Sequence, residues 1–316
     1  GLAQKVGCFE QEFAQFCQTQ YAVAVANGTL ALDLALQVLD IGKGDEVIVT
    51  SRTFIASVSS IINAGATPVF ADVELNSQNI SARTISAVMS NNTKAIICVH
   101  LAGWPCEMDD IMTLAEQHNL MVIEDCAQAH GTQYKGRAVG SIGHIGCWSF
   151  CQDKIMTTGG EGGMLTTNDE TLWRKAWAYK DHGKSYAAVY EKQHPDGFRW
   201  LHESFGTNWR LTEMQSTIGR IQLTRMPKWH QARKNNAAKI RQVCQQYTWL
   251  IVPEIPEYIE HAFYKCYIHI ALELLPAGCS RESIIAEIGQ AGVPCFSGSC
   301  SEVYKEKAFK YTGLEP

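Results

Sequence analysis

The sequence predicts an α/β fold in which a mostly parallel sheet lies between two layers of helices. Its N-terminal half alternates short β-rich runs with helical patterns. Strands are predicted over residues 46–50, 67–73, 95–100 and 121–125, and helices over 29–39, 54–64, 81–89 and 108–118. Near-continuous apolar runs are typical of strands buried on both faces. Such alternation favours parallel strands, and ligands then bind beyond the carboxyl ends of the strands.

The chain is long enough for two domains. Its 316 residues, 46% of them hydrophobic, exceed the usual size of one compact unit. We predict a large domain over residues 1–225 and a smaller C-terminal α+β domain over 226–316. A long helical stretch from Leu211 to about Ala238 leaves the first domain, and the second contains a strand-like run over 262–270 and a helix over 281–291.

Charge and cysteine content exclude several classes of protein. A net charge of -5 provides no basic surface for nucleic acid, and no run of about 18 apolar residues is present to span a membrane. The twelve cysteines are scattered and lack the paired short spacings of a zinc site. No signal peptide is visible. We therefore expect a cytoplasmic protein with reduced, mostly buried thiols and no metal.

Lys154 is the first candidate for chemistry. It lies in the segment 148–163, downstream of the apolar run that ends at Asp125. A lysine amine can form a Schiff base with an aldehyde. An acid at the end of a buried strand can keep a pyridinium nitrogen protonated, which makes the ring of pyridoxal phosphate (PLP) an electron sink. A lone lysine beside a glycine-rich turn is more often an ordinary surface residue, so the interpretation depends on the neighbouring motifs.

One such motif is a phosphate cradle. Asn27-Gly28-Thr29 stands between a strand-like run, 21–26, and a helix that begins near Leu30. The free amides of a first helical turn attract phosphate, Gly28 permits close approach of the backbone, and the Thr29 hydroxyl adds a donor. The triplet alone is more often an ordinary helix N-cap.

The glycine-rich run 159–163 requires a separate explanation. It lacks the lysine and Ser/Thr of a Walker motif and the strand-to-helix setting of a dinucleotide fingerprint, which disfavours a Rossmann dehydrogenase. We expect these glycines to let the backbone turn tightly beside the cofactor.

Five segments in order carry a family resemblance: 27–32, 53–57, 124–131, 149–163 and 206–215. Through them nearly the whole chain resembles the DegT/DnrJ/EryC1/StrS sugar aminotransferases, which have the PLP-dependent aminotransferase fold type I. Within that family the segments 27–29, 150–154 and 297–302 are most similar to the nucleotide-sugar aminotransferases that serve pilin glycans and surface polysaccharides.

The resemblance assigns roles by position. It implies that Lys154 is the Schiff-base lysine and Asp125 the partner of the pyridinium. Further cofactor-binding positions are Gly28, Thr29, Leu30, Phe54, Gln128, Ser149 and Asn208. Phe54 would stack on the ring, Gln128 would lie near it, and Ser149 and the Leu30 amide would contact the phosphate. Asn208 would reach the phosphate of the partner subunit in a homodimer with shared active sites.

The implied reaction transfers an amino group from glutamate, releasing 2-oxoglutarate, to a nucleotide-linked keto-deoxysugar. The best candidate is UDP-linked 4-keto-6-deoxy-N-acetylhexosamine; alternatives are a 3-keto sugar and a non-catalytic PLP-binding regulatory homologue. PLP-dependent sugar dehydratases of the family carry His where this chain has Lys154. Arg199, Arg210 and Lys184 are candidates for the diphosphate. Relatives continue before Gly1 and beyond Pro316, so we expect part of a longer protein.

Overall fold

The computed structural model describes residues 4–298 and 302–314, and its centre is a seven-stranded sheet. The strands are β1 (Tyr21–Val25), β2 (Glu46–Thr50), β3 (Thr67–Ala71), β4 (Thr93–Val99), β5 (Met121–Asp125), β8 (Ile145–Ser149) and β9 (Gly163–Thr167). Their order is β1-β9-β8-β5-β4-β2-β3. Only β9 runs against the others, since both of its neighbours pair with it antiparallel. The predicted mostly parallel α/β sheet is therefore confirmed.

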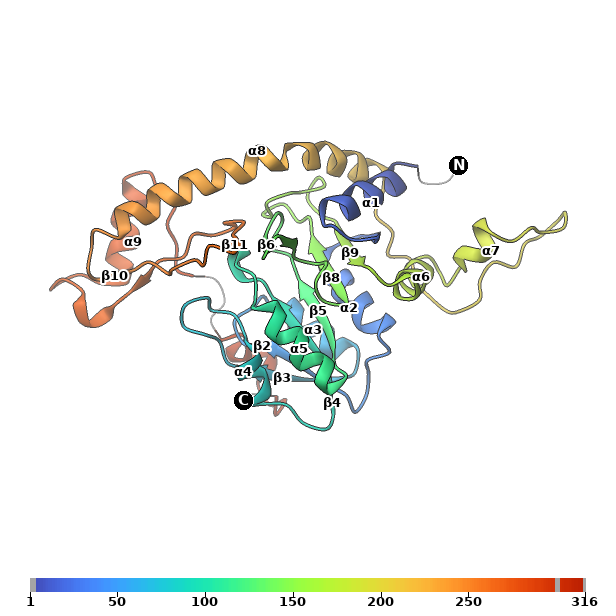
Figure 1. Cartoon of the computed structure of the whole chain (residues 1–316), viewed down its shortest axis with the longest axis horizontal. Helices are drawn as coiled ribbons and strands as arrows, with labels where there is room; N and C mark the ends of the chain where they lie inside the picture. The colour runs from blue at the N-terminus through green and yellow to red at the C-terminus, as the bar shows by residue number, and fades with distance from the viewer. Residues whose placement is uncertain (1–3, 299–301, 315–316) are drawn as a thin grey trace.

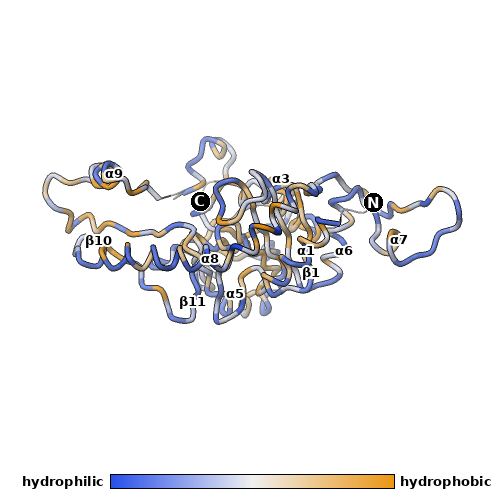
Figure 2. Tube along the Cα trace, turned by 90° about the horizontal axis from the view of Figure 1, so that it is seen from above, coloured by the Kyte–Doolittle hydropathy of each residue, from blue (hydrophilic) through white to orange (hydrophobic). Residues whose placement is uncertain are grey.

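Helices cover both faces of this sheet (Figure 1). One face packs on α2 (Gly28–Val38), α3 (Ala56–Asn63) and α6 (Glu170–Tyr179). The other packs on α1 (Gln4–Phe16), α4 (Ala82–Ser86), α5 (Met108–His118) and α8 (Glu213–Cys244). Successive residues of a strand point to opposite faces, so Val122 contributes to one core and Ile123 to the other. Figure 2 shows many apolar segments at the centre of the molecule and others in the C-terminal part near α9 and β10.

Most predicted elements lie within a few residues of their expected places, and the run 262–270 is the main exception. It was expected as a strand, but only β12 (His269–Ile270) is extended, paired with β10 (Leu250–Ile251). Phe263 has a φ of 49°, which interrupts an extended backbone. The Ala262 and Lys265 amides donate instead to the carbonyls of Gly103 and Ala102.

The C-terminal part of the chain crosses the predicted boundary at residues 225/226 more than once. Helix α8 runs through it without a break at Pro227. A small sheet joins β11 (Ile259–Glu260) to β6 (Gln133–Tyr134) and β7 (Arg137–Ala138). The 3-10 helices η3 (Val303–Lys305) and η4 (Lys307–Phe309) return to the main sheet, and Val303 and Phe309 join its core on the side of α2 and α3. The two-domain division stays a prediction.

Several short elements lie outside these layers. Helix α9 (Arg281–Gln290) buries none of its residues. Helix α7 (Tyr186–Tyr190) belongs to a projecting arm, residues 186–206, which extends from the body in Figure 1. The arm exposes Phe198, Trp200 and Phe205. The remaining short elements are η1 (Leu101–Gly103) and η2 (Leu272–Leu274).

Strand β1 forms one edge of the main sheet, and side chains bond its outer main-chain groups. The Ala24 amide donates to Glu10 Oε1 at 2.8 Å, and Lys180 Nζ donates to the Ala24 carbonyl at 3.3 Å. Lys180 and Glu10 also form an ion pair at 3.0 Å, in which the side chains are 7% and 16% exposed. The pair fixes the strand that leads into Asn27.

Two global properties bear on the sequence-based predictions. No helix within residues 4–298 and 302–314 is long and apolar enough to cross a membrane. The eleven described cysteines are all free, and five of them are buried: Cys17, Cys98, Cys106, Cys126 and Cys147.

Candidate active site

The predicted site residues gather at the edge of the sheet where the parallel strands end. Asn27 follows β1, Phe54 follows β2, Asp125 ends β5 and Ser149 ends β8. Because β9 is antiparallel, its first residue, Gly163, lies at the same edge.

The cradle predicted around Gly28 has the geometry of a phosphate site. An added Cβ at Gly28 would lie 2.6 Å from the Ser149 Cβ, so only glycine lets the start of α2 pack this closely on Ser149. The Gly163 backbone closes the other side, where an added Cβ would lie 2.3 Å from the Asn27 carbonyl oxygen. The Leu30 amide, expected to bind phosphate, donates instead to Asn27 Oδ1 at 2.9 Å.

The first-turn amides of Gly28 and Thr29 have no earlier helical carbonyl to bond, because the α2 ladder starts with the Ala31 amide on the Asn27 carbonyl. These two amides and the hydroxyls of Thr29 and Ser149 are donors available to a phosphate.

Asp125 is a buried acid at the end of β5. Ser57 Oγ donates to its Oδ2 at 2.8 Å, and the Ala127 amide donates to its Oδ1 at 3.1 Å. Burial raises the pKa of Asp125 above its ordinary value, although these hydrogen bonds and the charge of Lys154 oppose the shift. A cation against this carboxyl group would favour its ionised form, as the nitrogen of a pyridinium does.

Lys154 lies between an acid and an aromatic ring. Its side chain is 17% exposed, and its Nζ is 3.5 Å from Asp153 Oδ2 and 5.2 Å from the centre of the Tyr264 ring. The Tyr264 hydroxyl donates to the same Asp153 oxygen at 2.7 Å. Burial alone would raise the pKa of Asp153, but the hydrogen bonds from Tyr264 and Cys151 lower it overall. This ionised acid keeps the lysine ammonium near the ring.

Phe54 and Gln128 flank this group. The Phe54 side chain is 63% exposed immediately before α3, which leaves its ring face open to a ligand. Gln128 Oε1 accepts a hydrogen bond from the Ala102 amide at 2.7 Å, so its position is fixed by the loop after β4.

Asn208 is exposed, on a backbone bridge to Asp181. The neighbouring Trp209 carbonyl accepts from the Ala26 amide at 2.9 Å, which places this stretch beside the end of β1 in the same chain.

The predicted diphosphate contacts divide into two groups. Arg210 and Lys184 both bond to Asp181, so one acid already compensates part of their charge. Arg199 is exposed on the projecting arm.

A second buried acid next to Asp125 was missed by sequence reasoning. Glu124 accepts the His100 Nε2 proton at 2.9 Å and the amides of Gly140, Ile142 and Gly143 at 2.9, 2.9 and 2.6 Å. The Cys106 amide donates to His100 Nδ1 at 3.1 Å, so the proton of the neutral ring is on Nε2. Burial would raise the pKa of Glu124, but these bonds lower it.

Glu124, His100 and Cys126 are close enough together to suggest a metal site. However, both nitrogens of His100 are bonded, and burial holds the pKa of the Cys126 thiol well above its ordinary value. This cluster is therefore a closed hydrogen-bond network that supports the end of β5. In the sequence, the acidic Glu124 within the apolar run 121–125 already indicated a buried charge that needs partners.

Comparison with known proteins decides the family. The model of the DegT/DnrJ/EryC1/StrS aminotransferase family matches residues 3–308. The chain belongs to this family. Its members depend on PLP, and the cradle, Asp125 and Lys154 fit that cofactor at its phosphate, pyridine nitrogen and aldehyde.

Family members with assigned names differ in their substrates. GDP-perosamine synthase of Escherichia coli O157:H7 is 46% identical over 215 residues, which are 68% of this chain and 56% of that protein. This chain thus matches just over half the length of that synthase. UDP-N-acetyl-3-dehydro-alpha-D-glucosamine 3-aminotransferase of Acidithiobacillus ferrooxidans is 40% identical over 91% of this chain and 74% of that protein.

Solved structures of the family share the fold. An aminotransferase from Psychrobacter cryohalolentis is 64% identical, with a TM-score of 0.97 over 99% of this chain and 81% of that one. DesV of S. venezuelae, in complex with a ketimine intermediate, is 30% identical with a TM-score of 0.87 over 99% of this chain and 78% of that one. The expected fold type I is confirmed.

Proposed function

We propose that this chain transfers an amino group from glutamate to a nucleotide-linked keto-deoxysugar, with PLP as cofactor, for the synthesis of surface glycans or glycoproteins. The observation that carries the proposal is the convergence of Lys154, Asp125 and the Gly28–Ser149 cradle at one edge of the sheet. The names of the relatives support a sugar as acceptor.

Each residue then has a distinct task. The bound cofactor would supply an electron sink for the charge left when the α-carbon of the donor loses its proton. Gly28, Thr29 and Ser149 would anchor its phosphate, and Asp125 would hold the pyridine nitrogen protonated. Lys154 Nζ would bind the cofactor covalently and, when free, carry the proton from the donor. Asp153 and Tyr264 would orient the free amine.

For the acceptor, we propose UDP-linked 4-keto-6-deoxy-N-acetylhexosamine. A second candidate is a 3-keto sugar, favoured by the A. ferrooxidans relative, whose name specifies amination at position 3 of a UDP-linked sugar. The relatives are named for GDP- and UDP-linked sugars, so the nucleotide is part of the proposal.

The test is mass spectrometry of products formed with PLP, glutamate and a panel of nucleotide keto-sugars. We expect a 4-amino product from the UDP-linked 4-keto sugar and little conversion of pyruvate or oxaloacetate. Amination at position 3 would favour the second candidate. A higher kcat/KM with pyruvate would mean that the acceptor is a keto acid and the sugar proposal is wrong.

The regulatory alternative also has a specific observation behind it. The pleiotropic regulatory protein of Geobacillus stearothermophilus is 35% identical over 78% of this chain. A non-catalytic homologue should bind PLP but fail to convert it with glutamate. Loss of the PLP absorbance band on adding glutamate, with release of 2-oxoglutarate, would exclude this alternative.

We also propose a cytoplasmic homodimer with shared active sites. Free cysteines support a reducing compartment, and the exposed aromatic side chains of the arm suit burial against a second copy. Heterodimers of Lys154→Ala and Asn208→Ala subunits test the sharing. If Asn208 acts across the interface, one active site of the heterodimer contains both substitutions and the other contains neither, so activity returns at that second site. No recovery would place Asn208 in the site of its own subunit.

A further inference from the structure

Arg52 is a cation at the active-site edge, and none of the described residues is an acidic partner for it. It lies between the end of β2 and Phe54 and is partly buried. Its Nη1 donates to Gln78 Oε1, and its guanidinium carbon lies 5.2 Å from the centre of the Tyr267 ring. No carboxylate in residues 4–298 or 302–314 lies within ion-pair distance of it, and its buried Nε has no hydrogen-bond acceptor there.

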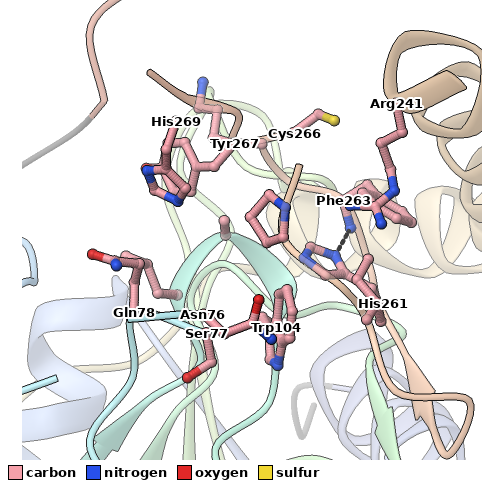
Figure 3. Close-up of a pocket in the computed structure, with 15 residues that line it drawn as sticks. Asn76, Ser77, Gln78, Trp104, Arg241, His261, Phe263, Cys266, Tyr267 and His269 are labelled. Carbon is pink, nitrogen blue, oxygen red and sulfur yellow. Dashed lines mark hydrogen bonds between the residues drawn. The ribbon is translucent and has the colours of Figure 1, made fainter. Parts of the chain in front are cut away.

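The surroundings of Arg52 add positive charge. Gln78 and Tyr267 line a pocket between the large domain and the C-terminal segment (Figure 3). Arg241 and Lys265 also line this pocket, and none of its described lining residues is acidic. His269 is on the Tyr267 side in Figure 3; burial and then the charge of Arg52 lower its pKa, so it stays neutral and adds no repulsion at neutral pH.

This arrangement is unfavourable for an arginine by itself. A partly buried guanidinium loses hydration, and a neutral amide oxygen compensates for this less well than an anion does. Gln78 and Tyr267 nevertheless fix the group in one orientation. A fixed planar guanidinium matches the two oxygens of a carboxylate, with which arginine forms paired, charge-assisted hydrogen bonds.

The backbone of Arg52 is close to two predicted site residues, Phe54 and Asp125. It is two residues from Phe54, so their Cα atoms are at most about 7 Å apart. Between them Thr53 Oγ1 is 2.7 Å from Ser57 Oγ, which donates to Asp125. The residue after Arg52 is thus tied through Ser57 to Asp125, and the backbone of Arg52 lies at the same edge of the sheet as that acid.

We propose that Arg52 binds a carboxylate of the substrate, an inference that rests on the proposed transamination. Two sources of that carboxylate fit: the amino-acid donor, or an acidic sugar on the acceptor. In either case Arg52 is a specificity-determining residue, because an analogue without the carboxylate leaves the guanidinium unpaired.

Equilibrium binding separates the two sources. The PLP-loaded protein and its Arg52→Gln and Arg52→Lys variants would be titrated calorimetrically with glutarate, and with UDP-glucuronate compared with UDP-glucose. Arg137→Gln is the matched control, since Arg137 on β7 pairs with Asp109 on α5. A lost charge-assisted pair should weaken carboxylate binding about 10- to 100-fold. Arg52→Lys keeps the charge but not the paired geometry, so we expect an intermediate loss.

Weaker glutarate binding would assign Arg52 to the donor. A loss confined to UDP-glucuronate, with UDP-glucose unchanged, would assign it to the acceptor. Unchanged affinity for both acids in both variants would overturn the proposal, as would a wild-type protein that binds neither acid. Glutamate conversion by the wild type is measured in parallel. If it is absent while acid binding still depends on Arg52, the transamination proposal fails and the carboxylate site stands.

Discussion

The sheet body and the peripheral segments of this protein are built differently. In the body, β5 and β8 are almost fully buried, and hydrogen bonds hold the side chains of Asp125 and Gln128. At the periphery, α9 has no fully buried residue, β10 and β12 have two residues each, and the arm 186–206 exposes the rings of Phe198, Trp200 and Phe205. The body can therefore specify its own structure, whereas the periphery depends on contacts with other chain segments or with a partner.

The strongest test of this contrast is covalent labelling of lysines. Borohydride should fix PLP to Lys154 in the body and leave Lys192 on the arm unlabelled, as peptide mass spectrometry would show. Lys154→Ala should still bind PLP but lose turnover about 1000-fold or more, because the proton-carrying amine is absent. Lys192→Ala should behave as wild type. An adduct on any other lysine would contradict the assignment.

A second test compares two aspartates. Asp125→Asn preserves shape but removes the charge that stabilises the pyridinium, so kcat should fall about 100-fold or more with only modest loss of PLP. Asp196→Asn, an exposed change on the arm, should leave kcat unaltered. Turnover and cofactor content are measured on both proteins. Near-normal turnover in Asp125→Asn would mean that another group partners the ring.

A third test measures stability rather than activity. Glu124→Gln leaves His100 and three backbone amides facing a side chain with one acceptor oxygen, so the free energy of unfolding should fall by about 3–5 kcal/mol. Ile288→Ala on α9 should cost less than about 0.5 kcal/mol. Denaturant titration checks both values. Similar losses in the two variants would show that α9 is as tightly integrated as the body.

The smallest effect concerns acid stability. Burial lowers the pKa of His130 from 6.5 to about 3, and that of His261 in the C-terminal part also to about 3. At a pH between 6.5 and about 3, each of these histidines is protonated in the unfolded chain but neutral in the folded chain. The free energy of unfolding therefore falls as pH drops from 6.5 towards 3. His130→Phe, in contact with Trp148 and Phe150, should flatten the slope by up to about 1.4 kcal/mol per pH unit.

His261→Phe sharpens the comparison. This variant should flatten the dependence of the free energy of unfolding on pH as much as His130→Phe does, but only if residues 259–264 unfold together with the body. An unchanged slope in His261→Phe, with a flatter one in His130→Phe, would show that this segment opens independently.

Sequence patterns predicted the body well for a physical reason. Strands β2 and β5 and helix α5 have the predicted bounds, because apolar runs and helical periodicity directly record burial within one layered core. The run 262–270 has the same apolar character, but its amides bond to the η1 loop, a distant partner that no local pattern reveals.

The site was partly predictable for a related reason. Lys154, Asp125 and Gly28 lie in local motifs, and the structure brings them to one edge. Ser57, Tyr264 and Arg52 act through partners far away in the chain, so their roles depend on the tertiary fold. The Leu30 amide was wrongly predicted to bind phosphate because of a local contact. It donates to the side chain of Asn27, only three residues before it.

The ion pair of Glu10 and Lys180 has a consequence for assembly. An exposed edge strand is a template on which another chain can add its own strand and propagate a fibre. At β1 the carboxylate and ammonium bond the Ala24 amide and carbonyl, and Trp209 accepts from the Ala26 amide just beyond the strand. Continuous β-pairing of another chain along this edge is therefore blocked.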